Sequence, residues 1–212
     1  MKQVPYHGNP GNACALACYT MTAQYLFPEL NITFEQLGKI ASWKRGYVVW
    51  AYPVWKWLMD KGAYVTDIDA IDVDLWAKEG TEGLRKSVSA KEFEFYKNNT
   101  FNLDDITKQL SLVYSHPNFT YVQKRMTWDD VINEFNKPGI CDITVDGSKL
   151  RRKDGFNVHR VVLVDITDTE VIFHDPNKDS TGAYVHEPID FFRSTFENLD
   201  GPEMARYSRS KK

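Results

Sequence analysis

Long hydrophobic runs are absent from this sequence of 212 residues. No eighteen consecutive residues are apolar, and the segment from Met1 to Pro5 lacks the apolar stretch of a signal peptide. We therefore expect no contact with a membrane. The net charge is also small, −3 at pH 7, with both signs mixed along the chain. Nucleic acid is therefore not an expected partner.

Cysteine is scarce as well. The chain has three cysteines, and two of them, Cys14 and Cys18, are only four residues apart. Three cysteines cannot form the disulfide framework of a small secreted domain, so a reducing, cytoplasmic compartment is expected. A zinc site on this pair is disfavoured because the usual Cys-x-x-Cys spacing and a fourth ligand are missing. The sequence has no glycine-rich phosphate loop and no internal repeat, and we expect no metal and no cofactor.

The composition that remains is that of a folded protein. Apolar residues make up 42% of the chain and aromatic residues 14%, enough for one domain with a substantial core over residues 1–212. Helical patterns come first and β-rich segments come second, an order typical of an α+β fold. The expected helices are 13–26, 33–41, 53–61, 88–98, 103–114, 128–135 and 189–192, and the expected strands are 63–68, 140–145, 158–166, 171–174 and 183–185.

Two segments fall outside this regular pattern. The charged region 69–125 has few strand signals and is expected to be an insertion or elaboration between two halves of the domain. The basic segment from Arg206 to Lys212 is expected to be frayed and solvated. A cluster of four tryptophans either lines a substrate groove or fills the core: Trp43, Trp50, Trp55 and Trp57.

The helix that begins after Pro10-Gly11 carries the most reactive candidate side chain. Asn12 is a suitable N-cap, which places Cys14 in the first turn. There the unpaired backbone N–H groups and the positive end of the helix dipole favour a thiolate over a thiol. The alternative is that Cys14 only packs, because free cysteines commonly face a core.

A β-hairpin further along the chain supplies two more candidates. His159 opens the apolar segment 159–166, a turn follows, and the returning strand leads into Asp175-Pro176. Any register centred on the turn places Asp175 within about two residues of the position opposite His159, so its carboxylate can reach the imidazole. His174 is expected to face the other side of the sheet in a structural role, and Cys141 to lie in the core.

Cys14, His159 and Asp175 together supply the parts of a catalytic triad. A thiolate nucleophile needs a base that removes its proton, and the base needs a partner that fixes its tautomer and supports its positive charge. Each residue alone has an ordinary structural explanation. The combination favours catalysis.

These motifs resemble those of papain-like cysteine peptidases, in particular the branch of bacteriocin-leader-processing (double-glycine) peptidase domains. In that branch a cysteine opens the first helix, with alanine three and methionine seven residues later, as in Cys14, Ala17 and Met21. Its second motif is a histidine that opens an apolar strand, followed by a hairpin that ends in Asp-Pro, as in His159 and Asp175-Pro176. The resemblance covers most of the chain except about residues 69–125.

The resemblance implies a papain-like α+β fold, in which an N-terminal helical half packs its nucleophile helix on a C-terminal antiparallel β-sheet. It also implies cleavage of a peptide or related amide bond, in a peptide or protein substrate, through a thioester on Cys14. His159 would act as general base and then acid, and Asp175 would orient it. Two alternatives share these motifs: an amidase or acyl or aminoacyl transferase, and a catalytically silent binding module.

The sequence departs from the family at two positions. Ala15 follows the nucleophile where the family usually has glycine, and Gly8 stands where the family has the glutamine of the oxyanion hole. The backbone N–H of Cys14 remains one donor. A second donor would have to come from Asn9, which we favour because a neutral amide donates at any pH, or from His7 or Asn12.

Overall fold

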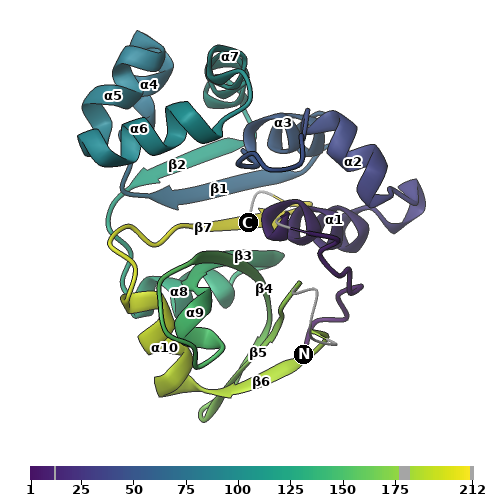
Figure 1. Ribbon diagram of the computed structural model, residues 1–212. Coiled ribbons are helices and arrows are strands. Elements are labelled where there is room, and N and C mark those ends of the chain that lie inside the picture. Colours follow the sequence, from purple (N-terminus) through teal and green to yellow (C-terminus); the bar gives the residue numbers. More distant parts are fainter. Residues whose placement is uncertain (12, 177–181, 211–212) are drawn as a thin grey trace.

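The computed structural model describes residues 1–11, 13–176 and 182–210. Over these residues the chain forms an α+β fold with ten α-helices and one seven-stranded mixed sheet, in the order β2-β1-β7-β3-β4-β5-β6 (Figure 1). The strands are β1 (Tyr64–Asp69), β2 (Phe119–Gln123), β3 (Ile140–Asp146), β4 (Val158–Ile166), β5 (Glu170–His174), β6 (Val185–Pro188) and β7 (Met204–Ser208).

The helices divide between the two faces of this sheet. One core cluster joins α1, α3, α4, α5 and α7 to alternate residues of β4 such as Val162 and Val164, and the other joins α8 and α10 to Val161 and Leu163. This alternation follows from the two-residue period of a strand, which here is buried on both faces. The helices are α1 (Cys14–Leu26), α2 (Phe34–Ile40), α3 (Tyr52–Asp60), α4 (Val73–Glu79), α5 (Thr81–Ser87), α6 (Ala90–Asn99), α7 (Leu103–Tyr114), α8 (Trp128–Phe135), α9 (Gly147–Leu150) and α10 (Ile189–Glu197), with a 3₁₀ turn at Pro28–Leu30.

Local capping signals explain where several helices begin. Thr33 and Gln36 form the expected capping box of α2, and Thr127 caps α8 in a box closed by Asp130. Helix α1 begins at Cys14, with Ala13 in the cap position and no side-chain cap. Asn12, the expected N-cap, lies outside the described residues. None of the helices in the described ranges is long and apolar enough to cross a bilayer.

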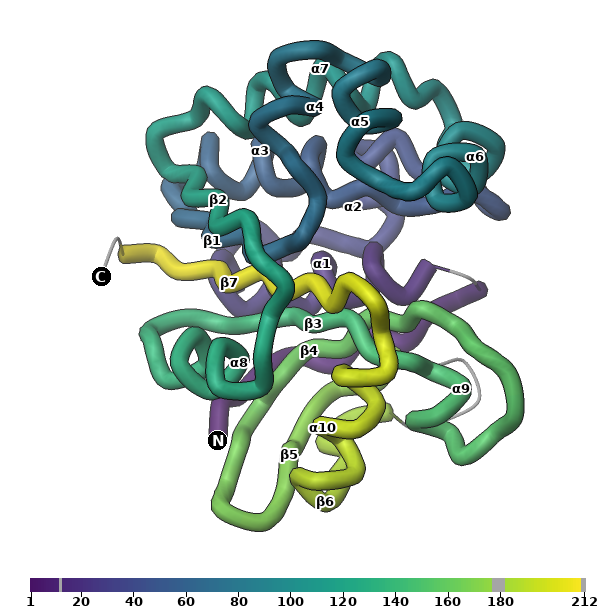
Figure 2. The backbone as a smooth tube through the Cα atoms, turned by 90° about the vertical axis from the view of Figure 1, so that its left-hand side faces the viewer, coloured from purple at the N-terminus to yellow at the C-terminus, as the bar shows by residue number. Residues whose placement is uncertain are grey.

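Region 69–125 is richer in structure than its sequence predicts. Helices α6 and α7 confirm the two expected helices, but α4, α5 and β2 were not predicted. β2 pairs in parallel with β1, so the sheet is mixed rather than the purely antiparallel sheet that we expected. The region also shares the main core cluster, where the Nε1 of Trp76 donates to the hydroxyl of Thr107 at 3.0 Å. Figure 2 shows these helices gathered beyond β1 and β2.

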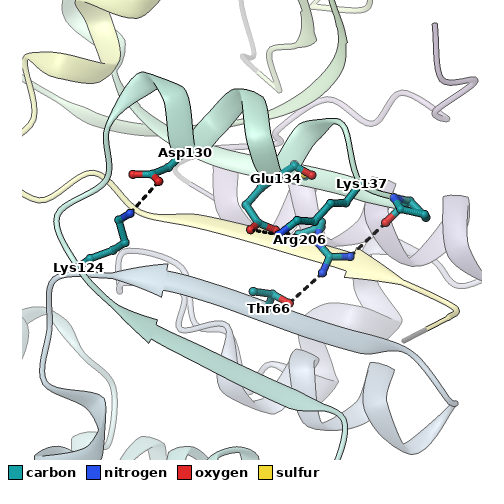
Figure 3. Close-up of polar contacts among 8 residues, drawn as sticks. Thr66, Lys124, Asp130, Glu134, Lys137 and Arg206 are labelled. Carbon is teal, nitrogen blue, oxygen red and sulfur yellow. Dashed lines mark hydrogen bonds and ion pairs between the residues drawn. The ribbon is translucent and has the colours of Figure 1, made fainter. Parts of the chain in front are cut away.

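The expectation of a frayed basic segment from Arg206 onward is wrong for residues 206–208. They belong to β7, which lies between β1 and β3 in the middle of the sheet, and Tyr207 is fully buried. The basic side chain has a structural use: Arg206 binds Glu134 at 2.9 Å, the carbonyl of Pro138 at 3.2 Å and Thr66 at 3.2 Å (Figure 3). Arg206 therefore links α8 to two strands, which its charge alone does not indicate.

Candidate active site

Helix α1 is fixed against β4, the strand that carries His159. Cys14 is the first residue of α1 and is partly exposed, whereas Leu16, Ala17 and Cys18 are fully buried. One turn below Cys14, the thiol of Cys18 donates to the carbonyl of Arg160 at 3.3 Å. Helix α1 is therefore anchored beside the residue that follows His159.

The hairpin brings His159 and Asp175 together as the sequence predicts. β4 pairs with β5 so that Val162 lies opposite His174 and Leu163 opposite Phe173. Continued by one residue, this register puts Asp175 opposite Val161, on the same face as His159 and diagonal to it. The Nε2 of His159 is 2.7 Å from the Oδ1 of Asp175, and the two side chains are nearly buried.

The side chains of Cys14 and His159 also interact, and each shifts the pKa of the other. Burial opposes the thiolate of Cys14, but the hydrogen bond and charge of His159, with the backbone N–H of Arg160, lower its pKa below the usual value. Burial likewise opposes the charged imidazole, but the hydrogen bonds to Asp175 and Cys14 raise the pKa of His159 to about 9. Both shifts favour a thiolate and imidazolium pair at neutral pH.

The other two cysteines have the opposite electrostatic environment. Burial, followed by the charge of Asp142, raises the pKa of Cys18 well above its usual value. Burial raises the pKa of Cys141 to about 12, and this residue lies in the core as expected. Cys14 is therefore the one cysteine of the three that combines exposure with a stabilised thiolate.

The segment before α1 lies against the end of the hairpin. The hydroxyl of Tyr6 donates to the carbonyl of Asp175 at 3.3 Å, and the backbone N–H of Asn9 donates to the carbonyl of Pro176 at 3.1 Å. The N–H of Asp175 donates to the carbonyl of Gly182 at 2.8 Å. Gly182 has a φ of 44°, and a Cβ there would lie 1.9 Å from the carbonyl oxygen of Asp175. Only glycine fits this contact.

The three candidate oxyanion donors differ in where they lie and in what their side chains bind. The Oδ1 of Asn9 accepts from the N–H groups of Gly11 and Ala13, both at 2.9 Å, so this side chain holds the turn before α1 and keeps its NH₂ group as a donor. The Nδ1 of His7 is 2.8 Å from the carbonyl of Gly8, and its ring stacks on Phe34. Asn12 lies outside the described residues. As the first helical residue, Cys14 has a backbone N–H without an intrahelical acceptor.

His174 has the structural role expected of it. Its Nε2 is 2.9 Å from the carbonyl of Val4, and its Nδ1 accepts from the N–H of Tyr184 at 3.0 Å. The aromatic rings of Tyr6 and Tyr184 contact it edge-on. Both ring nitrogens are thus used to hold the N-terminal segment and the chain before β6 against β5.

Sequence reasoning missed Arg160, which is buried beside the triad. Its guanidinium binds the carboxylates of Asp142 on β3 and Glu203 before β7. Asp142 also accepts from the hydroxyl of Tyr207 at 2.8 Å, which accepts from the Nε1 of Trp55 at 2.9 Å. The available signal was the position of Asp142 and Arg160 inside two largely apolar strands, since such charges are buried only when paired.

A group of carboxylates with few cations lies next to this network. Asp67 is 2% exposed, and its Oδ1 has no hydrogen-bond partner among the described residues. Burial, then the charges of Glu203 and Asp69, raises the pKa of Asp67 well above its usual value. Burial, with the charge of Glu203, raises the pKa of Asp69 to about 7. Folding at neutral pH therefore favours proton uptake by these carboxyl groups.

This proton uptake makes the stability of the fold depend on pH. A carboxyl group whose pKa is raised in the folded state contributes stability that is fully present below about pH 4, the pKa of the unfolded chain. This stability is lost as the pH rises towards the folded pKa, which is about 7 for Asp69. We expect Asp67→Asn, which needs no proton, to raise the free energy of unfolding by about 1–3 kcal/mol at pH 8 and by less at pH 5.

Urea unfolding at the two pH values measures this effect, with Asp168→Asn in an exposed turn as the matched control. An Asp67→Asn protein whose stability changes with pH as steeply as that of the wild type would contradict the assignment.

No group of three or more His, Cys, Asp or Glu side chains is arranged to hold a metal ion within the ranges that the structure covers. No family model matches the sequence, and no curated protein matches it.

Proposed function

We propose that this protein is a cysteine hydrolase, similar to papain-like peptidases, that cleaves a peptide or related amide bond. One observation carries the proposal: a partly exposed thiol at the start of a helix interacts with an imidazole whose Nε2 is 2.7 Å from a carboxylate. The same residues carry the resemblance between the sequence and the papain-like family. The arrangement also fits the order of roles that thiol catalysis requires.

Each side chain has a defined task in the proposed reaction. The thiolate of Cys14 attacks the carbonyl carbon, and the imidazolium of His159 gives its proton to the departing amine, so that a thioester remains. Neutral His159 then removes a proton from water, which attacks the thioester and releases the acid. Because Asp175 occupies Nε2, the Nδ1 of His159 is the nitrogen left to exchange the proton. An amine in place of water would make the same site a transferase.

Alkylation with iodoacetamide tests the nucleophile without a known substrate. An ordinary thiol reacts roughly 100-fold more slowly at pH 6 than at pH 8, because its thiolate fraction falls. We expect the rate of Cys14 to fall less than that of an ordinary thiol between pH 8 and pH 6. At pH 6 we expect Cys14 to react at least about 10-fold faster than Cys18 or Cys141, as followed by peptide mass spectrometry.

The control is His159→Ala, which should return Cys14 to the pH dependence of an ordinary thiol. If Cys14 in the wild type already behaves as an ordinary thiol, a silent binding module becomes the better description, and the missing donor at Gly8 agrees with that outcome.

A further inference from the structure

A cavity of about 690 Å³ lies beside the turn that leads into Cys14. Its wall includes Pro10 and Gly11, and a chain of three residues spans at most about 11 Å, so Gly11 lies within that distance of Cys14. The ring of His7, in the same turn, stacks on Phe34 in the cavity wall at a centroid distance of 5.1 Å. The cavity is therefore within reach of a substrate bound at the triad.

The apolar part of the cavity comes from three aromatic rings. Phe34 is buried and meets Trp43 edge-on at 5.7 Å, and Phe101 is 40% exposed at the rim. The Nε1 of Trp43 is buried and has no hydrogen-bond partner in the described part of the chain. Buried indole N–H groups usually have an acceptor, so this unpaired donor is an unusual feature of a residue that lines the cavity.

The charges on the cavity have the opposite sign to the protein as a whole. Lys39, Lys44 and Arg45 line it together with a single carboxylate, Glu35, whereas the chain carries a net charge of −3. All three cations are exposed, and none makes an ion pair with another described residue. Some surface cations elsewhere, such as Lys56, are instead paired with carboxylates.

Two of these cations are positioned by their neighbours. A Cβ built on Gly11 would lie 3.7 Å from the Nη2 of Arg45, so the guanidinium lies over the turn before Cys14. The Nζ of Lys44 lies 3.4 Å above the centre of the Phe101 ring. Positive charge beside an aromatic wall suits a carboxylate at the end of an apolar stem, because the guanidinium binds carboxylates through a fork of N–H donors.

Resting on the proposed function, we infer that this cavity is a subsite for a carboxylate of the substrate. Three residues of extended peptide span about 10–11 Å, so the carboxylate lies within about three residues of the cleaved bond. It belongs either to an Asp or Glu side chain or to the C-terminus of a peptide. In both cases Arg45 and Lys44 bind the carboxylate, and Phe34 and Trp43 contact the apolar part.

A matched pair of covalent probes tests the inference. The chloromethyl ketones of acetyl-Glu-Ala-Gly and acetyl-Gln-Ala-Gly differ only in charge, and intact-protein mass spectrometry gives the rate of labelling of Cys14. We expect the Glu probe to react at least about 5-fold faster at low salt, and the ratio to fall towards one in Arg45→Glu and at high salt. Lys61→Glu, which makes the same change of net charge at an exposed site outside the cavity wall, should keep the ratio.

The two sources of the carboxylate are separated by competition. Acetyl-Ala-Ala peptides with a free C-terminal acid or an amide are added to the labelling reaction, and stronger protection by the acid indicates a C-terminal carboxylate. Two results would overturn the subsite. One is equal labelling by the Glu and Gln probes together with equal protection by acid and amide. The other is a Glu preference that persists in Arg45→Glu.

Failure of the proposed function gives a different result. In that case neither chloromethyl ketone labels Cys14 faster than a free thiol, and the cavity is tested by fluorescence anisotropy with fluorescein-labelled Glu and Gln versions of the same peptide. Binding of the Glu peptide that is at least about 5-fold tighter and is lost in Arg45→Glu supports the subsite. Equal binding of the two peptides rejects it.

Discussion

Replacement of Cys14 by alanine is expected to reduce turnover by at least about 10⁴-fold while the fold remains intact. The substitution removes the atom that forms the thioester in the proposed reaction, and no other described cysteine has a stabilised thiolate. Stability should change little, because Cys14 is partly exposed and alanine is the best helix former at its position. Fragment release from a peptide library measures turnover, and circular dichroism reports the fold.

Cys18→Ala is the matched control for this substitution. It removes a thiol from the same helix face, but Cys18 is buried and binds the carbonyl of Arg160. We expect activity to be retained and the free energy of unfolding to fall by about 1–2 kcal/mol, the usual effect of a small cavity and one lost hydrogen bond. The reverse pattern, with activity in Cys14→Ala and none in Cys18→Ala, would reverse the assignment.

Asp175→Asn is expected to lower kcat/KM by about 10- to 100-fold, and His159→Ala by at least about 10³-fold. An amide at position 175 can still hold the imidazole, whereas alanine at position 159 leaves the thiol without a base. Because hydrogen bonding to Asp175 contributes to raising the pKa of His159 to about 9, its loss should lower that pKa. Activity that needs the imidazolium is lost as the pH rises through this pKa.

The alkaline limb of the activity profile should therefore move to lower pH in Asp175→Asn. A pH profile of kcat/KM between pH 5 and 10 measures the displacement and separates it from a loss of structure, which would reduce activity at every pH. An unchanged limb in Asp175→Asn, with activity reduced, would show that Asp175 does not act on His159.

The sequence predicted the parts of the site that depend on neighbours along the chain. The hairpin register that joins His159 to Asp175 follows from one turn and two apolar strands, and the first-turn position of Cys14 follows from the break at Pro10-Gly11. Thr33 likewise marks the start of α2. In each case the deciding interaction lies within about twenty residues.

The missed strands and the missed ion pairs depend on partners that are distant in sequence. The sequence of β7 resembles an exposed basic segment, but its Arg206 binds Glu134, which lies more than seventy residues earlier. β2 forms a strand through its parallel pairing with β1. The pairing of Arg160 with Asp142 and Glu203 is of the same kind. A charged residue is predicted to be exposed to solvent unless its counterion is known, and the local sequence does not identify the counterion.

The central place of β7 has a consequence for synthesis of the chain. The ribosome makes β1 and β2 early and β3 to β6 next, but these two groups of strands have no backbone pairing with each other until residues 204–208 emerge and join them. Until then the facing edges of β1 and β3 are open to other chains, which is the exposure that chaperones limit during translation. Completion of the sheet is therefore a late, long-range step, and a nascent chain stalled before Met204 holds every residue of the triad without a finished scaffold.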